Sequence, residues 1–150
     1  MRILFIDPPY KSAIQEVLGL HGPLLGFGSM SYQLEKEGHE VEILDCPTLG
    51  LNLFDAVKSV EKFDPDVVGI TSTTPSFGEA CKLAKAVKDS KPECVVVMGG
   101  PHVSFEDYDA LQKPYVDVVV RGEGEVTIRD LIASLGKSGA LQEVLGTRAR

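Results

Sequence analysis

The sequence predicts an α/β fold, a doubly wound sheet of five parallel strands with helices on both faces. Strand and helix patterns alternate along nearly the whole chain, as they do in α/β proteins. The last three strand-like runs are almost continuously apolar, which is typical of strands that are covered on both faces. The expected architecture is therefore Rossmann-like, with the flavodoxin-like strand order 2-1-3-4-5.

Five apolar segments, most of them rich in β-branched residues, are the predicted strands. They span residues 2–6, 41–44, 67–71, 94–98 and 116–120. Right-handed crossovers between parallel strands place every strand-to-helix junction at the same edge of the sheet. Ligands of open α/β sheets bind at this carboxyl edge, so its residues are the first candidates for a site.

Four helices are predicted from apolar residues that recur at helical spacing. The first ends at Gly38, the third begins at a Ser76–Glu79 capping box, and the last ends at Gly136. A further short helix is expected over residues 106–112. The four apolar stripes are Phe27, Met30 and Leu34; Leu53, Val57 and Val60; Phe77, Ala80, Cys81, Ala84 and Val87; and Ile128, Leu131, Ile132 and Leu135.

Length and charge limit the classes of function. A chain of 150 residues suits one domain, which we expect over residues 1–136, with 137–150 as the start of a linker to a further domain. The net charge of −7 disfavours nucleic acid and anionic membranes as partners. No apolar run approaches the roughly 20 residues of a membrane span, and the short N-terminal run is no signal peptide, so a cytoplasmic location is expected. The three cysteines form no metal-binding or disulfide pattern.

Unusual residues gather at four junctions of the carboxyl edge, whereas the opposite edge has plain turns. Paired glycines let a bulky ligand approach the backbone, hydroxyls bond a neutral polar ligand, and carboxylates favour a helix start. The candidate ligand-binding residues are Asp7, Pro8 and Pro9; Ser72, Thr73 and Thr74; Gly99, Gly100, Pro101 and His102; and Gly122, Glu123, Gly124 and Glu125.

Several common ligands fit this edge poorly. A dinucleotide or polyphosphate needs a glycine-rich turn after the first strand, where this chain has Asp7-Pro8-Pro9. A phosphorylatable receiver domain needs an Asp after the third strand and a Lys after the fifth, where this chain has hydroxyl residues and Arg-Gly-Glu. A large, mostly uncharged ligand rich in amides suits the edge better.

The junctions resemble the N-terminal cobalamin-binding domain of cobalamin-dependent radical SAM (S-adenosylmethionine) enzymes. That family includes methyltransferases and the anaerobic magnesium-protoporphyrin IX monomethyl ester oxidative cyclase. The resemblance covers nearly the whole chain and depends on five segments in order: FIDPP at 5–9, LEKEGHEV at 34–41, PDVVGIT at 65–71, GGPH at 99–102 and GEGE at 122–125.

The resemblance implies a corrin ring across the carboxyl edge, with its nucleotide tail inserted beside the sheet. By the family pattern, Ser72 and Thr74 would bond the tail, Gly99 and Gly100 would leave room for it, and residues 122–125 would line the far wall. From the residues alone, two roles stay open. Asp7 either braces its loop or contacts ligand, and His102 is either a turn histidine or a cofactor contact.

The sequence departs from the cobalamin mutases and methionine synthase. Their Asp-x-His-x-x-Gly motif supplies a histidine that ligates cobalt from below, but counting from Asp7 the corresponding positions are Pro9 and Ser12. That lower ligand is therefore excluded, which favours the radical SAM branch. The CxxxCxxC motif that would hold a [4Fe-4S] cluster beside S-adenosylmethionine does not occur in this sequence.

The resemblance thus implies a partner radical SAM domain in cis on the C-terminal side, and this chain alone is expected to perform no chemistry. Two alternatives remain open: a docking domain of the same family that has lost the corrinoid, and a flavodoxin-like domain that binds a flavin. The second is disfavoured because no phosphate-binding loop follows the first strand.

Overall fold

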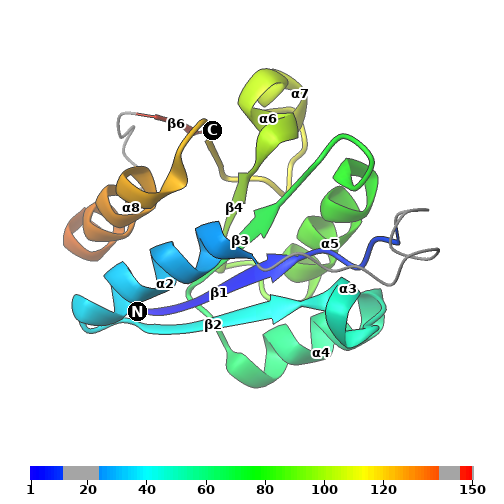
Figure 1. Ribbon diagram of the computed structural model, residues 1–150, viewed down its shortest axis with the longest axis horizontal. Helices are drawn as coiled ribbons and strands as arrows, with labels where there is room; N and C mark the ends of the chain where they lie inside the picture. The colour runs from blue at the N-terminus through cyan, green and yellow to red at the C-terminus, as the bar shows by residue number, and fades with distance from the viewer. Residues whose placement is uncertain (12–23, 139–145, 150) are drawn as a thin grey trace.

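A mixed sheet of six strands forms the centre of the computed structural model, which describes residues 1–11, 24–138 and 146–149 (Figure 1). The strand order is β2-β1-β3-β4-β5-β6. Strands β1 to β5 are parallel, and β6 runs antiparallel to β5. The strands are β1 (Arg2–Asp7), β2 (Glu40–Asp45), β3 (Val67–Thr71), β4 (Val95–Gly99), β5 (Val118–Val120) and β6 (Thr147–Ala149).

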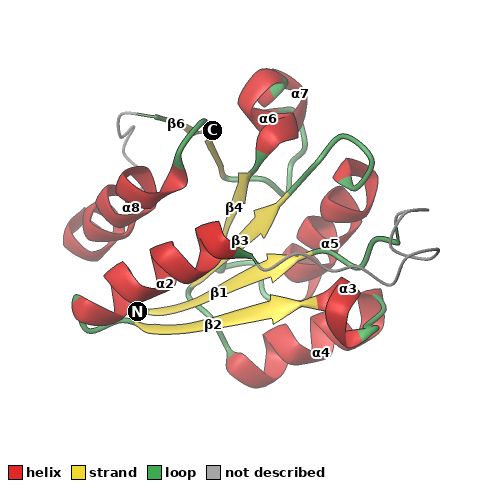
Figure 2. Cartoon of the chain, viewed as in Figure 1, coloured by secondary structure: helices red, strands yellow, loops and turns green. Residues whose placement is uncertain are grey.

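Helices cover both faces of the sheet (Figure 2). Helices α2 and α8 pack on one face, and α4 and α5 pack on the other together with three short helices, so the predicted doubly wound architecture is confirmed. The helices are α2 (Leu25–Lys36), α3 (Cys46–Leu49), α4 (Leu53–Phe63), α5 (Phe77–Ser90), α6 (Pro101–Phe105), α7 (Asp107–Leu111) and α8 (Gly124–Ser138).

Alternation along each strand divides the core into two clusters. Ile3 and Phe5 of β1 face α2 and α8, whereas Leu4 and Ile6 face α4 and α5. By the same alternation, the last residues of β3 and β4, Thr71 and Gly99, lie on the α2 and α8 side. On this side, β3 therefore ends in a hydroxyl residue, Thr71, and β4 ends in a residue without a side chain, Gly99.

The predicted order 2-1-3-4-5 is confirmed for the parallel strands, but the predicted strand count of five is wrong. The sixth strand, β6, lies inside 137–150, the range expected to begin a linker, and residues 139–145 of that range lie outside the described part. Arg148 of β6 donates to Asp107 of α7 across 3.1 Å. A strand of three residues carries no apolar run long enough to detect, so only its pairing with β5 reveals it.

Two helix ends differ from the predictions. The Ser76–Glu79 capping box is wrong: Ser76 makes no capping bond, and its Oγ accepts a hydrogen bond from the Thr73 backbone N–H at 2.9 Å. Helix α8 continues through Gly136, which was expected to end it.

A capping box does occur at the start of α4, where the Asn52 side chain accepts from the Asp55 N–H at 3.0 Å. The apolar stripe of this helix was recognised, but its cap was not. Among the described residues, no helix combines the length and the apolar character that crossing a membrane requires.

Candidate functional site

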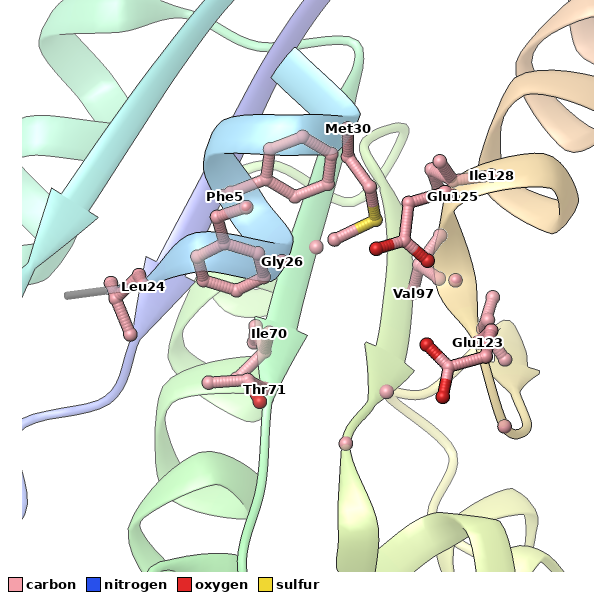
Figure 3. Close-up of a pocket in the computed structure, with 17 residues that line it drawn as sticks. Phe5, Leu24, Gly26, Met30, Ile70, Thr71, Val97, Glu123, Glu125 and Ile128 are labelled. Atoms are coloured by element: carbon pink, nitrogen blue, oxygen red, sulfur yellow. The ribbon is translucent and has the colours of Figure 1, made fainter. Parts of the chain in front are cut away.

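A cavity of about 250 Å³ opens at the carboxyl edge between α2 and α8, on the face where Thr71 and Gly99 end their strands (Figure 3). Its walls come from the ends of four strands and from both helices. The residues that line it are Phe5, Leu24, Gly26, Phe27, Met30, Gly69, Ile70, Thr71, Val97, Gly99, Gly100, Val120, Gly122, Glu123, Gly124, Glu125 and Ile128.

The interior of the cavity is apolar. The rings of Phe5 and Phe27 stack with their centroids 5.0 Å apart and tie β1 to α2. Val97 and Ile128 are almost completely buried, so they add aliphatic surface from β4 and α8. Such a wall favours a flat apolar group over a charged one.

Two glycines form the floor of the cavity. A Cβ on Gly69 would lie 2.6 Å from the Phe5 ring, so glycine at this position lets the ring pack directly against β3. Of the described residues beyond its chain neighbours, a Cβ on Gly99 would meet only Val120 within 4 Å, at 3.8 Å from its carbonyl oxygen and 4.0 Å from its Cβ. The protein itself therefore leaves room at Gly99, and the space above it belongs to the cavity.

Gly100 is a glycine for a different reason. Its φ is +101°, and a Cβ there would lie 2.6 Å from the Ser72 carbonyl oxygen and 2.8 Å from the Ser72 nitrogen. These are backbone atoms that cannot move aside cheaply. The close contact between the segments that follow β3 and β4 therefore requires glycine at this position whether or not a ligand is bound.

The hydroxyl residues after β3 bond within the protein and do not line the cavity. Ser72 is fully buried, and its Oγ donates to the Gly99 carbonyl oxygen across 3.2 Å. Thr73 is held by Ser76, whose Oγ lies 3.0 Å from Thr73 Oγ1. Thr71, which was not among the predicted site residues, is the hydroxyl residue of this segment that reaches the cavity.

His102 is held in place by the segment that follows β3 and by the start of α5. Its Nδ1 lies 3.3 Å from Thr74 Oγ1, and its ring packs on Phe77 with the centroids 4.2 Å apart. Its backbone N–H donates to the Ser72 carbonyl oxygen across 3.2 Å. His102 therefore lies in the first turn of the short helix α6 rather than in a turn, and its ring does not line the cavity.

Asp7 ends β1 directly opposite Asp45 of β2. Burial of its carboxyl and the nearby Asp45 raise the pKa of Asp7 to about 6. Burial and the same two carboxylates raise the pKa of the Cys46 thiol to about 12, so this cysteine is no nucleophile at neutral pH. Asp7, Pro8 and Pro9 lie outside the lining of the cavity.

The Gly-Glu-Gly-Glu segment forms the α8 side of the mouth. Gly122 has a φ of +67°, which suits glycine, and its N–H donates to Ser104 Oγ across 3.0 Å. A Cβ on Gly124 would lie 3.1 Å from Met30 Sδ, so this glycine lets α8 approach α2. Glu123 and Glu125 lie at the start of α8, where carboxylates favour the helix dipole.

The structure thus brings part of the predicted site together. Gly99, Gly100, Gly122, Glu123, Gly124 and Glu125 line one cavity, whereas Asp7, Pro8, Pro9, Ser72, Thr73, Thr74, Pro101 and His102 lie outside its lining. The aromatic and aliphatic walls were not predicted as site residues. One signal in the sequence was Gly69, because a glycine inside a Val- and Ile-rich strand marks a close approach.

Comparison with known proteins identifies the family of this domain. An uncharacterized methyltransferase of Pyrococcus horikoshii is 42% identical over 147 residues, which cover 97% of this chain and 32% of the relative. The anaerobic magnesium-protoporphyrin IX monomethyl ester cyclase of Synechocystis is 31% identical over 153 residues, covering 100% of this chain and 31% of the relative. The chain therefore spans about a third of the length of these relatives.

A solved structure shares the fold. The chain matches the cobalamin-dependent S-adenosylmethionine radical enzyme OxsB, determined with aqua-cobalamin and S-adenosylmethionine bound, with a TM-score of 0.81 and 22% sequence identity. The match covers 97% of this chain and 20% of OxsB. A family model, described as the B12 binding domain, matches residues 12–132. The family predicted from the five sequence segments is therefore confirmed, and the chain belongs to the B12-binding domain family.

Proposed function

We propose that this domain binds cobalamin, with the nucleotide tail in the cavity between α2 and α8 and the corrin ring across the carboxyl edge. The observation that carries the proposal is the cavity itself, which is apolar inside, has glycines as its floor and opens at the ligand-binding edge of the sheet. At about 250 Å³ it is smaller than the pockets that enclose whole drug-sized ligands, which measure roughly 300–1,000 Å³. It suits the tail of the cofactor rather than the macrocycle.

Residues of the chain would hold the cofactor in two zones. Inside the cavity, Phe5, Phe27 and Val97 would pack against the base of the tail, and Gly99 would leave space for it. At the mouth, Glu123 and Glu125 can accept hydrogen bonds from amide or sugar groups. The other contact residues that we propose are Asp7, Pro8, Pro9, Ser72, Thr73, Thr74, Gly100, Pro101, His102, Gly122 and Gly124.

The domain would act as a holder, and the chemistry would need a second domain. When bound, cobalamin supplies a cobalt centre that carries a methyl group or assists radical chemistry. We propose that the partner is a radical SAM domain in cis that binds S-adenosylmethionine and a [4Fe-4S] cluster, because both relatives are about three times longer than this chain.

Retention of cobalamin tests the proposal. The purified protein is mixed with hydroxocobalamin, desalted, and examined by visible absorbance. Corrinoid bands that stay with the protein support the proposal, and a colourless folded protein would instead favour a docking domain without ligand. A flavin spectrum on purification would favour the flavodoxin-like alternative.

A further inference from the structure

The distribution of polar groups inside the cavity bears on which tail it accepts. Only three of the 17 lining residues have side-chain oxygen or nitrogen atoms, namely Thr71, Glu123 and Glu125. Glu123 is exposed and Glu125 is half-buried, so both carboxylates stay hydrated at the α8 side of the mouth. Among the described side chains, a group that enters the interior therefore meets hydrocarbon and one hydroxyl.

Thr71 is placed to donate that single hydrogen bond. It ends β3 on the same face as Val67 and Gly69, and Figure 3 shows it at the edge of the cavity. Within residues 1–11, 24–138 and 146–149, no hydrogen bond engages Thr71 Oγ1, although the neighbouring hydroxyls of Ser72 and Thr73 are both engaged. Its hydroxyl is thus available to a ligand.

The backbone of the floor offers little in compensation. Thr71 and Gly99 are register partners in the β3–β4 ladder. The Gly99 carbonyl oxygen already accepts from the Ser72 N–H at 2.9 Å and from Ser72 Oγ at 3.2 Å. A ligand with several polar ring atoms would therefore find few partners along this floor.

We propose that the cavity selects corrinoids by the base at the end of the tail, accepting a benzimidazole or a phenol and disfavouring a purine. This inference rests on the proposed cobalamin-binding function. A benzimidazole that is not coordinated to cobalt has one ring nitrogen to satisfy, and Thr71 Oγ1 can donate to it. A phenol-derived base has no ring nitrogen, so the apolar walls of Phe5, Phe27 and Ile128 suffice.

A purine is disfavoured because of its extra polar atoms. Adenine carries an exocyclic amine and further ring nitrogens, which lose their bound water on entering the cavity. Each polar group that is buried without a partner weakens binding, and one or two such groups correspond to roughly a 10- to 100-fold loss of affinity. The selectivity therefore follows from the scarcity of hydrogen-bonding groups among the described lining residues and not from a steric clash.

Titration with four corrinoids tests the inference on the purified full chain. The probes are cobalamin, a phenolyl cobamide, adeninyl cobamide, and cobinamide, which has no nucleotide. Dissociation constants are measured by ultrafiltration and visible absorbance, without any assay of catalysis. We expect cobalamin and the phenolyl cobamide to bind with similar affinity, adeninyl cobamide to bind at least roughly 10-fold more weakly, and cobinamide to bind weakest.

The outcomes separate this inference from the proposed function. Equal affinity for adeninyl cobamide and cobalamin, or for cobinamide and cobalamin, overturns base selection while leaving cobalamin binding intact. No binding of any corrinoid refutes the proposed function itself.

Variants of Thr71 test the role of the hydroxyl. Thr71→Val should weaken cobalamin binding about 3- to 10-fold, as expected for one lost hydrogen bond, and leave the phenolyl cobamide unchanged. Thr71→Ser, which keeps the hydroxyl, should restore cobalamin binding. An equal loss for both corrinoids in Thr71→Val would contradict a bond to the base.

Discussion

Two adjacent glycines follow each other at the end of β4, and replacing them one at a time tests two different roles. Gly99 is expected to leave space for the ligand, whereas Gly100 is expected to be required by the fold. In Gly99→Val, the new Cβ would lie 3.8 Å from the nearest protein atom, which is ordinary contact, and its methyl groups would fill space in the cavity. With the tail bound, these methyl groups would overpack the site, and overpacking costs about 1 to 3 kcal/mol. Since 1.4 kcal/mol is tenfold, cobalamin should bind roughly 5- to 150-fold more weakly while the free energy of unfolding stays nearly unchanged.

Gly100→Ala should behave in the opposite way. Its Cβ would lie 2.6 Å from the Ser72 carbonyl oxygen, at a φ of +101°. The unfavourable conformation costs about 1 to 3 kcal/mol and the overlap a similar amount, so the loss of stability is about 2 to 6 kcal/mol. That is a large part of the roughly 5 to 15 kcal/mol that stabilises a typical domain.

Urea unfolding without ligand and titration with hydroxocobalamin measure the two effects on the same preparations. Gly99→Ala is a milder control, because its single added methyl should reduce affinity less than valine does. Wild-type affinity in a stably folded Gly99→Val would show that the tail does not enter this cavity. Wild-type stability in Gly100→Ala would refute the packing argument for Gly100.

Three further predictions concern stability. Burial and Asp45 raise the pKa of Asp7 to about 6, so the folded protein binds a proton that the unfolded chain has released, and stability should fall as pH rises from about 4 to about 6. Asp7→Asn should lessen that fall, and its free energy of unfolding at pH 7 should exceed that of the wild type by about 1 to 2 kcal/mol after solvent screening. Below pH 4 the two proteins should be equally stable. A difference in unfolding free energy that stays constant at all pH values in urea titrations would contradict this. Ser31 Oγ is buried without a hydrogen-bond partner among the described residues, so Ser31→Ala should raise the unfolding free energy by about 1 kcal/mol. A lower melting temperature of the variant would contradict this. Asn52→Ala removes the side chain that accepts the hydrogen bond from the Asp55 N–H at the start of α4, so the free energy of unfolding in urea should fall by about 1 kcal/mol. An unchanged midpoint would mean that the capping box does not stabilise the protein.

Much of the fold was readable from the sequence because its signals are local. The run at 67–71 predicted β3 with its observed bounds, and the stripe from Phe77 to Val87 predicted α5. The alternation of strands and helices predicted the doubly wound sheet, and the strand order was expected because it is one of the common orders of such sheets. By contrast, β6 depends on its pairing with β5, in which Val120 opposes Thr147 across 26 intervening residues, and no local pattern marks it.

The candidate site was predicted only in part. Gly99, Glu123 and Glu125 were identified because glycines and carboxylates at strand ends are unusual. Phe27 and Met30 carried the same helical signal as any core residue, so nothing distinguished a cavity wall from ordinary packing. Ser72 and Thr71 are neighbours with similar side chains, yet strand alternation turned only Thr71 toward the cavity.

The sequence by itself determined the succession of the five parallel strands and the four main helices, and the family, and it predicted the edge at which a ligand would bind. Each of these depends on the order and periodicity of residues along the chain. The tertiary structure decided the cavity and the separate reasons for Gly99 and Gly100. A cavity is the volume left between α2, α8 and the sheet, and that volume depends on how close Gly124 and Gly69 let those elements come.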